Sequence, residues 1–109
     1  MSRFFPAPEE CGRHVIFGSI PIRTYAGDHL HLSLVDMPLG GVVEWHSHDN
    51  EQMGMMIRGR AVFQIGDEEK TLGPGDFYLI PGNVRHRVTP IDGDAQALDV
   101  FYPIRDDYR

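Results

Sequence analysis

The 109-residue sequence contains one cysteine, few basic residues and no long apolar segment. Cys11 alone cannot form an internal disulfide, as is usual for proteins of a reducing compartment. Ten basic and sixteen acidic residues give a net charge of −6, so no excess of Lys or Arg can neutralise nucleic-acid phosphates. Residues 1–15 lack the basic start and apolar run of a secretion signal. We therefore expect a cytoplasmic protein that binds neither nucleic acid nor membrane and acts on a small molecule.

Helical periodicity is also absent. Apolar residues nowhere recur every 3.6 positions over a long segment, so no helix is predicted. Short runs of Val, Ile, Leu, Phe and Met instead alternate with turns such as Gly40-Gly41, Gly66-Asp67 and Gly73-Pro74-Gly75. The predicted strands cover residues 14–17, 20–26, 29–37, 42–48, 52–58, 60–65, 77–80, 85–89 and 96–102. At this length the chain forms one all-β domain, residues 1–109, and a jelly-roll β-barrel is the expected architecture.

Three histidines and a glutamine have the spacing of a metal site. The pattern is Gly40-x5-His46-x-His48-x3-Gln52-x6-Gly59, followed by Gly75-x5-Pro81-x4-His86. Residues two apart on a strand share a face, so the first two histidines point the same way. An isolated His-x-His pair is more often a surface feature or a hydrogen-bonded buried pair. Agreement at all eight positions favours metal binding.

This two-part pattern resembles the motifs of the cupin superfamily, small β-barrels in which two His, a Glu or Gln and a third His hold one metal. The resemblance covers about residues 30–102 and implies a cupin-type jelly roll. It leaves strands within residues 1–29 for contacts between subunits. Glu51 is the alternative third ligand, but only Gln52 keeps the x6-Gly spacing.

A glutamine at the third position changes the chemistry of such a site. Four neutral ligands leave a divalent ion its full charge, so it acts as a stronger Lewis acid and attracts anionic substrates. An oxidised metal receives less stabilisation, which disfavours oxygen chemistry. The residues do not distinguish among nickel, zinc, iron, cobalt, manganese and copper.

The C-terminal segment carries a second group of candidate residues. By strand alternation Asp99, Phe101, Pro103 and Arg105 share one face, which would bring a carboxylate, an aromatic ring and a guanidinium into the barrel. The alternative is an exposed face on which Arg105 pairs with neighbouring Asp106 or Asp107. Pro103 limits the length of the strand, so alternation predicts the direction of the Arg105 side chain less firmly than that of Asp99.

Together with the glutamine ligand, Asp-x-Phe-x-Pro-x-Arg-x-Asp-aromatic resembles the KdgF family, small cupins of pectin and alginate breakdown. Its members have about this length and open 4,5-unsaturated monouronates to their linear keto forms. The resemblance implies metal ligands at His46, His48, Gln52 and His86, and substrate-site residues at Asp99, Phe101 and Arg105. The run Met53-Gly54-Met55-Met56 departs from the expected bulkier residues and leaves the sugar undefined.

The implied hypothesis is that Arg105 binds the uronate carboxylate, Asp99 moves the proton and Phe101 excludes water. Two other classes stay open: a metal-dependent cupin dioxygenase, which would consume oxygen, and a sugar-binding cupin without turnover. Both would use the same metal ligands.

Several further residues receive simpler interpretations. His29 and His31 are expected to be structural, and Met53, Met55 and Met56 to fill the core. Arg85 and Arg87 flank His86 and should point away from it, whereas Arg58 and Arg60 could reach either rim. The apolar N-terminal residues Phe4, Phe5, Val15, Ile16 and Phe17 predict a homodimer that pairs through this region.

Overall fold

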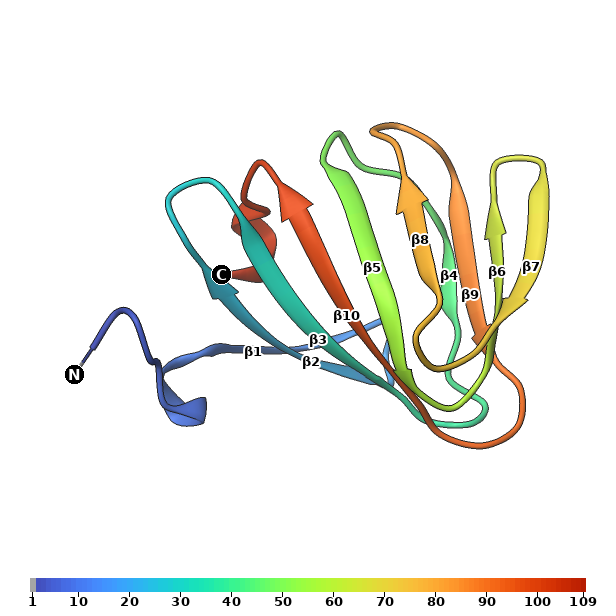
Figure 1. Ribbon diagram of the computed structural model, residues 1–109, viewed down its shortest axis with the longest axis horizontal. Coiled ribbons are helices and arrows are strands. Elements are labelled where there is room, and N and C mark those ends of the chain that lie inside the picture. Colours follow the sequence, from blue (N-terminus) through green and yellow to red (C-terminus); the bar gives the residue numbers. More distant parts are fainter. Residues whose placement is uncertain (1) are drawn as a thin grey trace.

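Residues 2–109 are described in a computed structural model and form ten strands and two short 3-10 helices (Figure 1). The elements are η1 (Pro8–Glu10), β1 (Gly12–Ile16), β2 (Ile20–Ala26), β3 (His31–Met37), β4 (Val43–His46), β5 (Glu51–Arg58), β6 (Ala61–Ile65), β7 (Glu68–Leu72), β8 (Phe77–Ile80), β9 (His86–Pro90), β10 (Ala95–Tyr102) and η2 (Asp106–Tyr108). Among these residues no helix is long and apolar enough to cross a membrane.

The strands form two antiparallel sheets that face each other. The six-stranded sheet has the order β1-β2-β3-β10-β5-β8, and the four-stranded sheet has the order β4-β9-β6-β7. Most of the apolar core lies on their inner faces, including Ile22, Val35, Met56, Phe63 and Val88. The predicted all-β jelly-roll architecture is confirmed.

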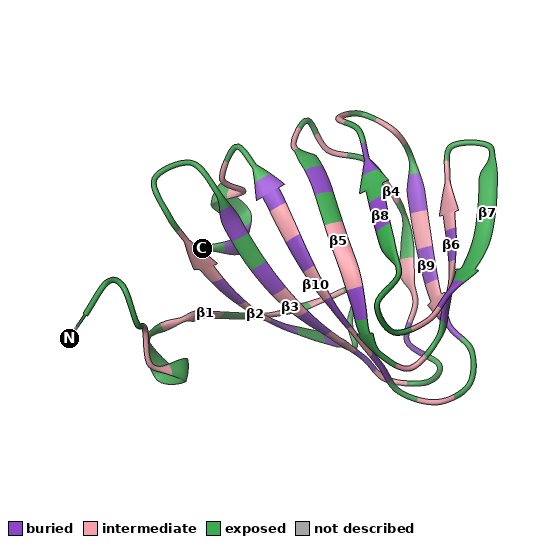
Figure 2. Ribbon diagram, in the orientation of Figure 1, coloured by how far each residue is buried: buried purple, intermediate pink, exposed green. Residues whose placement is uncertain are grey.

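Strand alternation determines which side chains enter the barrel. In β3, His31, Ser33, Val35 and Met37 are buried, while the residues between them face outward. The same alternation in β10 buries Asp99 and Phe101, as the sequence predicted. Figure 2 shows this alternation as buried segments that alternate with exposed or intermediate ones along β3 and with intermediate ones along most of β10.

The inner face of the six-stranded sheet carries an apolar row beside a polar one. Cross-strand pairing aligns Ile22, Val35, Ala97 and Met56 in the apolar row. The next row is Thr24, Ser33, Asp99, Gly54 and Tyr78. The polar side chains of the second row therefore lie directly beside the apolar side chains of the first.

Strand β7 was not predicted. Its sequence Glu-Glu-Lys-Thr-Leu has low strand propensity, and only Leu72 is buried. The strand lies at the edge of the four-stranded sheet, where backbone pairing with β6 holds it and charged side chains face solvent. The predicted turn at Gly66-Asp67 joins these two strands. The predicted strand 42–48 also ends early, at His46.

Candidate metal centre and adjoining pocket

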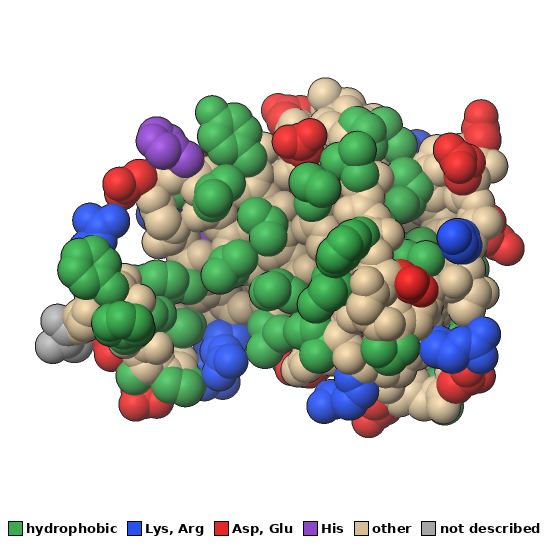
Figure 3. Space-filling view, in the orientation of Figure 1, with side chains coloured by type: hydrophobic (Ala, Val, Ile, Leu, Met, Phe, Trp, Pro, Cys, Tyr) green, Lys and Arg blue, Asp and Glu red, His purple; other side chains and the backbone are tan. Residues whose placement is uncertain are grey.

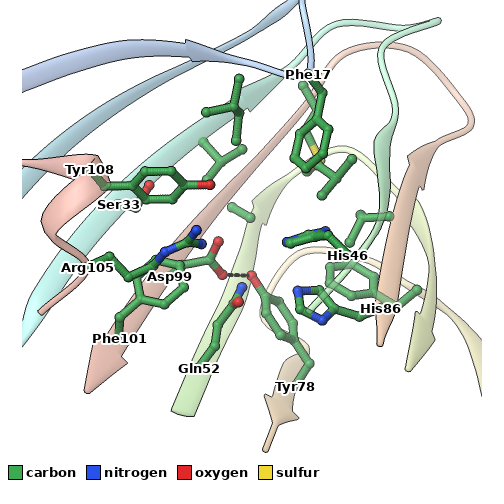
Figure 4. A pocket seen from close by; sticks show the side chains of 17 residues that line it. Phe17, Ser33, His46, Gln52, Tyr78, His86, Asp99, Phe101, Arg105 and Tyr108 are labelled. Atoms are coloured by element: carbon green, nitrogen blue, oxygen red, sulfur yellow. Dashed lines mark hydrogen bonds between the residues drawn. The ribbon is translucent and has the colours of Figure 1, made fainter. Parts of the chain in front are cut away.

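The three predicted histidine ligands converge. His46 ends β4 and is the cross-strand partner of His86, which begins β9. His48 follows in the loop before β5. One ring nitrogen from each of the three lies within 4.8 Å of the others. Segments 40 residues apart in the sequence thus supply one cluster, and Figure 4 shows its members His46 and His86 along one wall of a pocket.

All three rings make the same kind of hydrogen bond, which fixes their orientation. Each Nδ1 lies within hydrogen-bonding distance of a backbone carbonyl oxygen and therefore donates its hydrogen there. The accepting residues are Glu44 for His46 (2.7 Å), Asn50 for His48 (3.0 Å) and Val84 for His86 (2.9 Å). Each Nε2 is left with a free lone pair, the form in which imidazole binds a metal.

Gln52 completes a donor set that fits a metal ion. Its Oε1 lies 3.0 Å from Nε2 of His48, and with Nδ1 protonated both facing atoms carry lone pairs and no hydrogen. Nε2 of His86 is buried and has no hydrogen-bond partner. Two acceptors in contact and an unpartnered buried nitrogen are unfavourable without a cation and are satisfied by one.

Burial keeps these imidazoles neutral. Desolvation lowers the pKa of His46 and His48 below 6.5, and it lowers the pKa of His86 to about 4. The positive charge of Arg105 acts in the same direction at all three. The rings are therefore ready to coordinate a metal at neutral pH without first losing a proton.

A pocket adjoins the histidine cluster, with about 480 Å³ of empty space partly open to solvent. Asp99, Phe101 and Arg105 line it together with His46, Gln52 and His86, so the two predicted groups of residues share one cavity (Figure 4).

Asp99 is the buried carboxyl group of this pocket, with 8% of its surface exposed. Desolvation raises its pKa to about 6, although hydrogen bonds from Tyr78 and Gln52 and the charge of Arg105 favour the ionised form. Tyr78 donates its hydroxyl hydrogen to Oδ1, and burial and the nearby carboxylate raise the pKa of this phenol well above 10. Asp99 can thus gain or lose a proton near neutral pH.

Gly54 makes the Tyr78–Asp99 contact sterically feasible. It lies between these two residues in the cross-strand row, and a Cβ there would collide with the phenol oxygen and the Asp99 carboxylate. Gly54, which departs from the expected bulkier residues, therefore leaves the space in which Tyr78 and Asp99 meet.

Arg105 reaches the pocket from beyond β10, which ends at Tyr102. Its guanidinium carbon lies 3.8 Å from the Tyr108 ring centroid and 5.2 Å from that of Phe101. Nη2 pairs with Asp107 at 3.0 Å, as the alternative interpretation expected. The exposed face of that alternative is wrong, because Asp99 and Phe101 are buried. Pro103 is exposed and does not share the inner face. Stacking and one ion pair orient the guanidinium while further N–H groups stay available.

Several residues that line the pocket were not predicted to do so, among them Phe17, Ser33, Tyr78 and Tyr108. Alternation along β3 and β8 could have indicated Ser33 and Tyr78. Tyr108 belongs to η2 and offers no periodic signal. Phe17, which was expected between subunits, is 40% exposed, and its ring centroid lies 5.1 Å from that of His46.

The other predicted residues lie outside the pocket. His31 is buried and accepts a hydrogen bond from the Arg105 backbone at 3.1 Å, whereas His29 is exposed. Arg85 stacks on Trp45, Arg87 faces Glu44, Arg58 faces Asp36 and Arg60 pairs with Asp92. Of the three methionines expected in the core, Met56 is fully buried and Met53 is 53% exposed.

Residues 33–101 match the Cupin_2 family, described as a cupin domain. The protein is a member of the cupin family. Its curated relatives include the dimethylsulfoniopropionate lyase DddQ of Ruegeria pomeroyi, 32% identical over 68% of this chain and 37% of that protein. L-ectoine synthase of Rhodococcus erythropolis is 31% identical over 71% of this chain and 61% of that protein. The match thus spans only part of these relatives. Both of these relatives are named as enzymes, one a lyase and the other a synthase.

Solved cupins superpose on nearly the whole chain. KdgF from Halomonas sp. has a TM-score of 0.83 and 26% identity, covering 94% of this chain and 97% of that one. An RmlC-like cupin from Shewanella frigidimarina has a TM-score of 0.87 at 21% identity, covering 99% of this chain and 97% of that one. The second likeness concerns the fold alone.

Proposed function

We propose that this cupin is a metal-dependent enzyme that opens 4,5-unsaturated monouronates, derived from pectin or alginate, to linear 5-keto-4-deoxyuronates. The observation that carries the proposal is the shared pocket: a buried carboxyl group and an oriented guanidinium line the same cavity as the histidine–glutamine cluster. The likeness to the solved KdgF supports the same substrate class.

The candidate metal ligands are His46, His48, Gln52 and His86. A divalent ion held by them would act as a Lewis acid toward the oxygens of the substrate. The neutral donor set leaves that ion its full charge, which suits an anionic sugar.

Arg105 would bind the substrate carboxylate. Its guanidinium is stacked against Tyr108 and Phe101 and uses one nitrogen for Asp107, so a two-point contact with a carboxylate remains available. Phe101 is nearly fully buried and would exclude water from the sugar face. These contacts would present the ring to Asp99 in one orientation.

Asp99 would carry the proton. Its carboxylate accepts the hydrogen of the C1 hydroxyl, a carbonyl forms at C1, and the bond from C1 to the ring oxygen breaks to leave an enolate at C5. The same proton is then delivered to C4, which gives the ketone, so the substrate and product have the same composition. A pKa of about 6 allows both transfers near neutral pH.

The test is the loss of the ultraviolet absorbance of the 4,5-double bond when metal-loaded protein meets unsaturated galacturonate. The expected result is a rate above the spontaneous one that disappears after chelation and returns with metal. Oxygen is monitored in the same cuvette. Oxygen uptake would replace this proposal with a dioxygenase, and saturable binding without turnover would replace it with a sugar-binding cupin.

A further inference from the structure

The turn between β1 and β2 holds a bulky residue in a backbone conformation that such residues rarely adopt. The N–H group of Ser19 donates a hydrogen bond to the carbonyl oxygen of Ile16 across this turn, at 3.3 Å. Both central residues have positive φ, 50° at Phe17 and 79° at Gly18. In turns of this kind asparagine or glycine usually occupies the position of Phe17, because small or short polar residues tolerate such angles. Residues held in disfavoured backbone conformations concentrate at functional sites.

Exposure alone does not distinguish Phe17. Phe4, Phe5 and Phe77 are more exposed, and Figure 3 shows hydrophobic side chains spread over one face of the molecule. Those three phenylalanines do not line the pocket beside the histidine cluster. At Phe17 an unusual backbone angle and a place in the pocket lining coincide.

Core packing does not account for the phenylalanine either. Phe17 keeps 40% of its surface exposed, whereas Phe63 and Phe101, the other phenylalanines of the pocket lining, keep 4% and 2%. A residue that served only to fill the apolar core would lose most of its exposed surface on folding. Phe17 instead leaves ring surface that a molecule bound in the pocket would cover.

The ring lies beside the candidate metal centre. Its centroid is 5.1 Å from that of His46, so the edge hairpin of the six-stranded sheet contacts the first strand of the four-stranded sheet at this point. Figure 4 shows Phe17 on the side of the pocket away from Gln52 and Tyr78. A molecule held between the histidine cluster and Arg105 would therefore have the Phe17 ring against one of its faces.

A cyclic sugar acid has two kinds of surface, and the pocket offers a group for each. Its carboxylate and hydroxyl groups lie around the edge of the ring, where Asp99 and Arg105 supply polar contacts. Its ring faces carry C–H groups and the double bond, against which an aromatic side chain packs favourably. Phe17 lies outside residues 33–101, the segment that matches the cupin family, so the family likeness assigns it no role.

We propose that Phe17 is a substrate-contacting residue whose ring packs against one face of the cyclic uronate. This inference rests on the proposed function and extends it to the β1–β2 turn. The contact adds apolar surface to the substrate site and leaves proton transfer to Asp99, so it acts on binding rather than on the chemical step. The linear product has no ring face, so the same contact favours substrate over product.

The test uses the metal-loaded full chain and three variants. Phe17→Leu removes the ring but keeps an apolar side chain in the turn, and Phe17→Tyr keeps the ring. Phe5→Leu is the matched control at an exposed phenylalanine outside the pocket. Steady-state kinetics with unsaturated galacturonate gives KM and kcat. Calorimetric titration with saturated galacturonate, which has no 4,5-double bond to react, gives a dissociation constant, and melting temperature and metal content report on the fold.

Phe17→Leu should raise KM and the dissociation constant by about 10-fold and change kcat by less than about 2-fold, because a stacking contact is lost and the proton-transfer group is kept. Phe17→Tyr and Phe5→Leu should keep the values of the unmodified protein. Unchanged constants in the Phe17→Leu variant would overturn the proposal, and so would equal losses in the Leu and Tyr variants. A lower melting temperature with unchanged constants would assign Phe17 a structural role alone.

The same measurements separate this inference from the proposed function. Binding of galacturonate without turnover of the unsaturated sugar would contradict ring opening, and the dissociation constants would still decide the role of Phe17. Turnover that is insensitive to Phe17→Leu would leave ring opening intact and overturn the substrate contact. An unmodified protein that neither binds nor converts a uronate would overturn both.

Discussion

The inner and outer faces of the six-stranded sheet differ in the chemistry of their side chains, although the same strands build both. On β10, Asp99 and Phe101 line the pocket, while Leu98 and Val100 point to the opposite, outer face of the sheet. The inner face places polar groups where water is scarce, and the outer face places apolar groups where water is abundant. Burying polar groups costs stability unless they find partners, and the proposed metal and substrate would supply such partners on the inner face.

The largest expected effect comes from removing one candidate ligand inside. His86→Ala should abolish metal binding and lower turnover at least about 1000-fold, to the spontaneous rate. His29→Ala, at an exposed position, is the matched control and should change neither. Metal analysis after dialysis, together with the absorbance assay, distinguishes the two. Full metal retention in the His86 variant would exclude it as a ligand.

Asp99→Asn should lower kcat by about 1000-fold with metal content intact, because an amide cannot accept the proton. Asp36→Asn, on the outward side of β3, should retain the activity. Loss of the metal from the Asp99 variant would show that this residue acts as a ligand instead.

The same Asp99→Asn change should stabilise the metal-free protein. Burial raises the pKa of Asp99 from 3.8 to about 6, so the folded state holds its proton more tightly than the unfolded state between these values. Stability therefore falls as pH rises through this window, by about 3 kcal/mol for two pH units. The variant should lack this loss, so that its melting temperature exceeds that of the parent at pH 8 but not at pH 4.

Gly54→Ala should reduce turnover by about 100-fold, because the added methyl group forces Tyr78 and Asp99 apart. Gly73→Ala is a suitable control, since a Cβ there meets only the Arg60 side chain at an ordinary 3.7 Å. Steady-state kinetics should place the loss in kcat. An active Gly54 variant would mean that the phenol–carboxylate contact does not matter for the reaction.

Arg105→Lys should raise KM by about 10-fold with a smaller change in kcat, because an ammonium keeps the charge but loses the two-point contact and the stacking. Arg58→Lys, at a residue that faces Asp36 outside the pocket, is the counterpart that should keep the same KM. Initial rates over a range of uronate concentrations provide the comparison. An unchanged KM at position 105 would place the substrate carboxylate elsewhere.

Much of this organisation could be predicted from the sequence because it depends on alternation and turns. Alternation along β10 points Asp99 and Phe101 into the barrel, and turns that contain glycine or proline separate the strands. The spacing of His46, His48 and His86 predicted a cluster that the structure assembles.

The rest depends on contacts that no periodic pattern encodes. Strand β7 is held by its backbone rather than by apolar side chains, so composition alone could not reveal it. Tyr108 comes from η2, beyond the last strand. Phe17, whose φ is 50°, lines the pocket from the turn after β1. The sequence predicts Arg105 in the pocket only if strand alternation continues to it, but β10 ends three residues earlier, at Tyr102. It arrives there because its backbone N–H donates to the buried His31 and its side chain stacks on Tyr108.

The candidate ligands also have a mechanical consequence. His46 and His86 belong to the four-stranded sheet and Gln52 to the six-stranded one, and no strand pairing joins the two. An ion held by these residues would fasten the two sheets together at the mouth of the barrel. Metal loading should therefore slow hydrogen exchange in β4, β5 and β9 more than in β7, which β6 separates from β9. The affinity of the site would then add directly to the resistance to thermal unfolding.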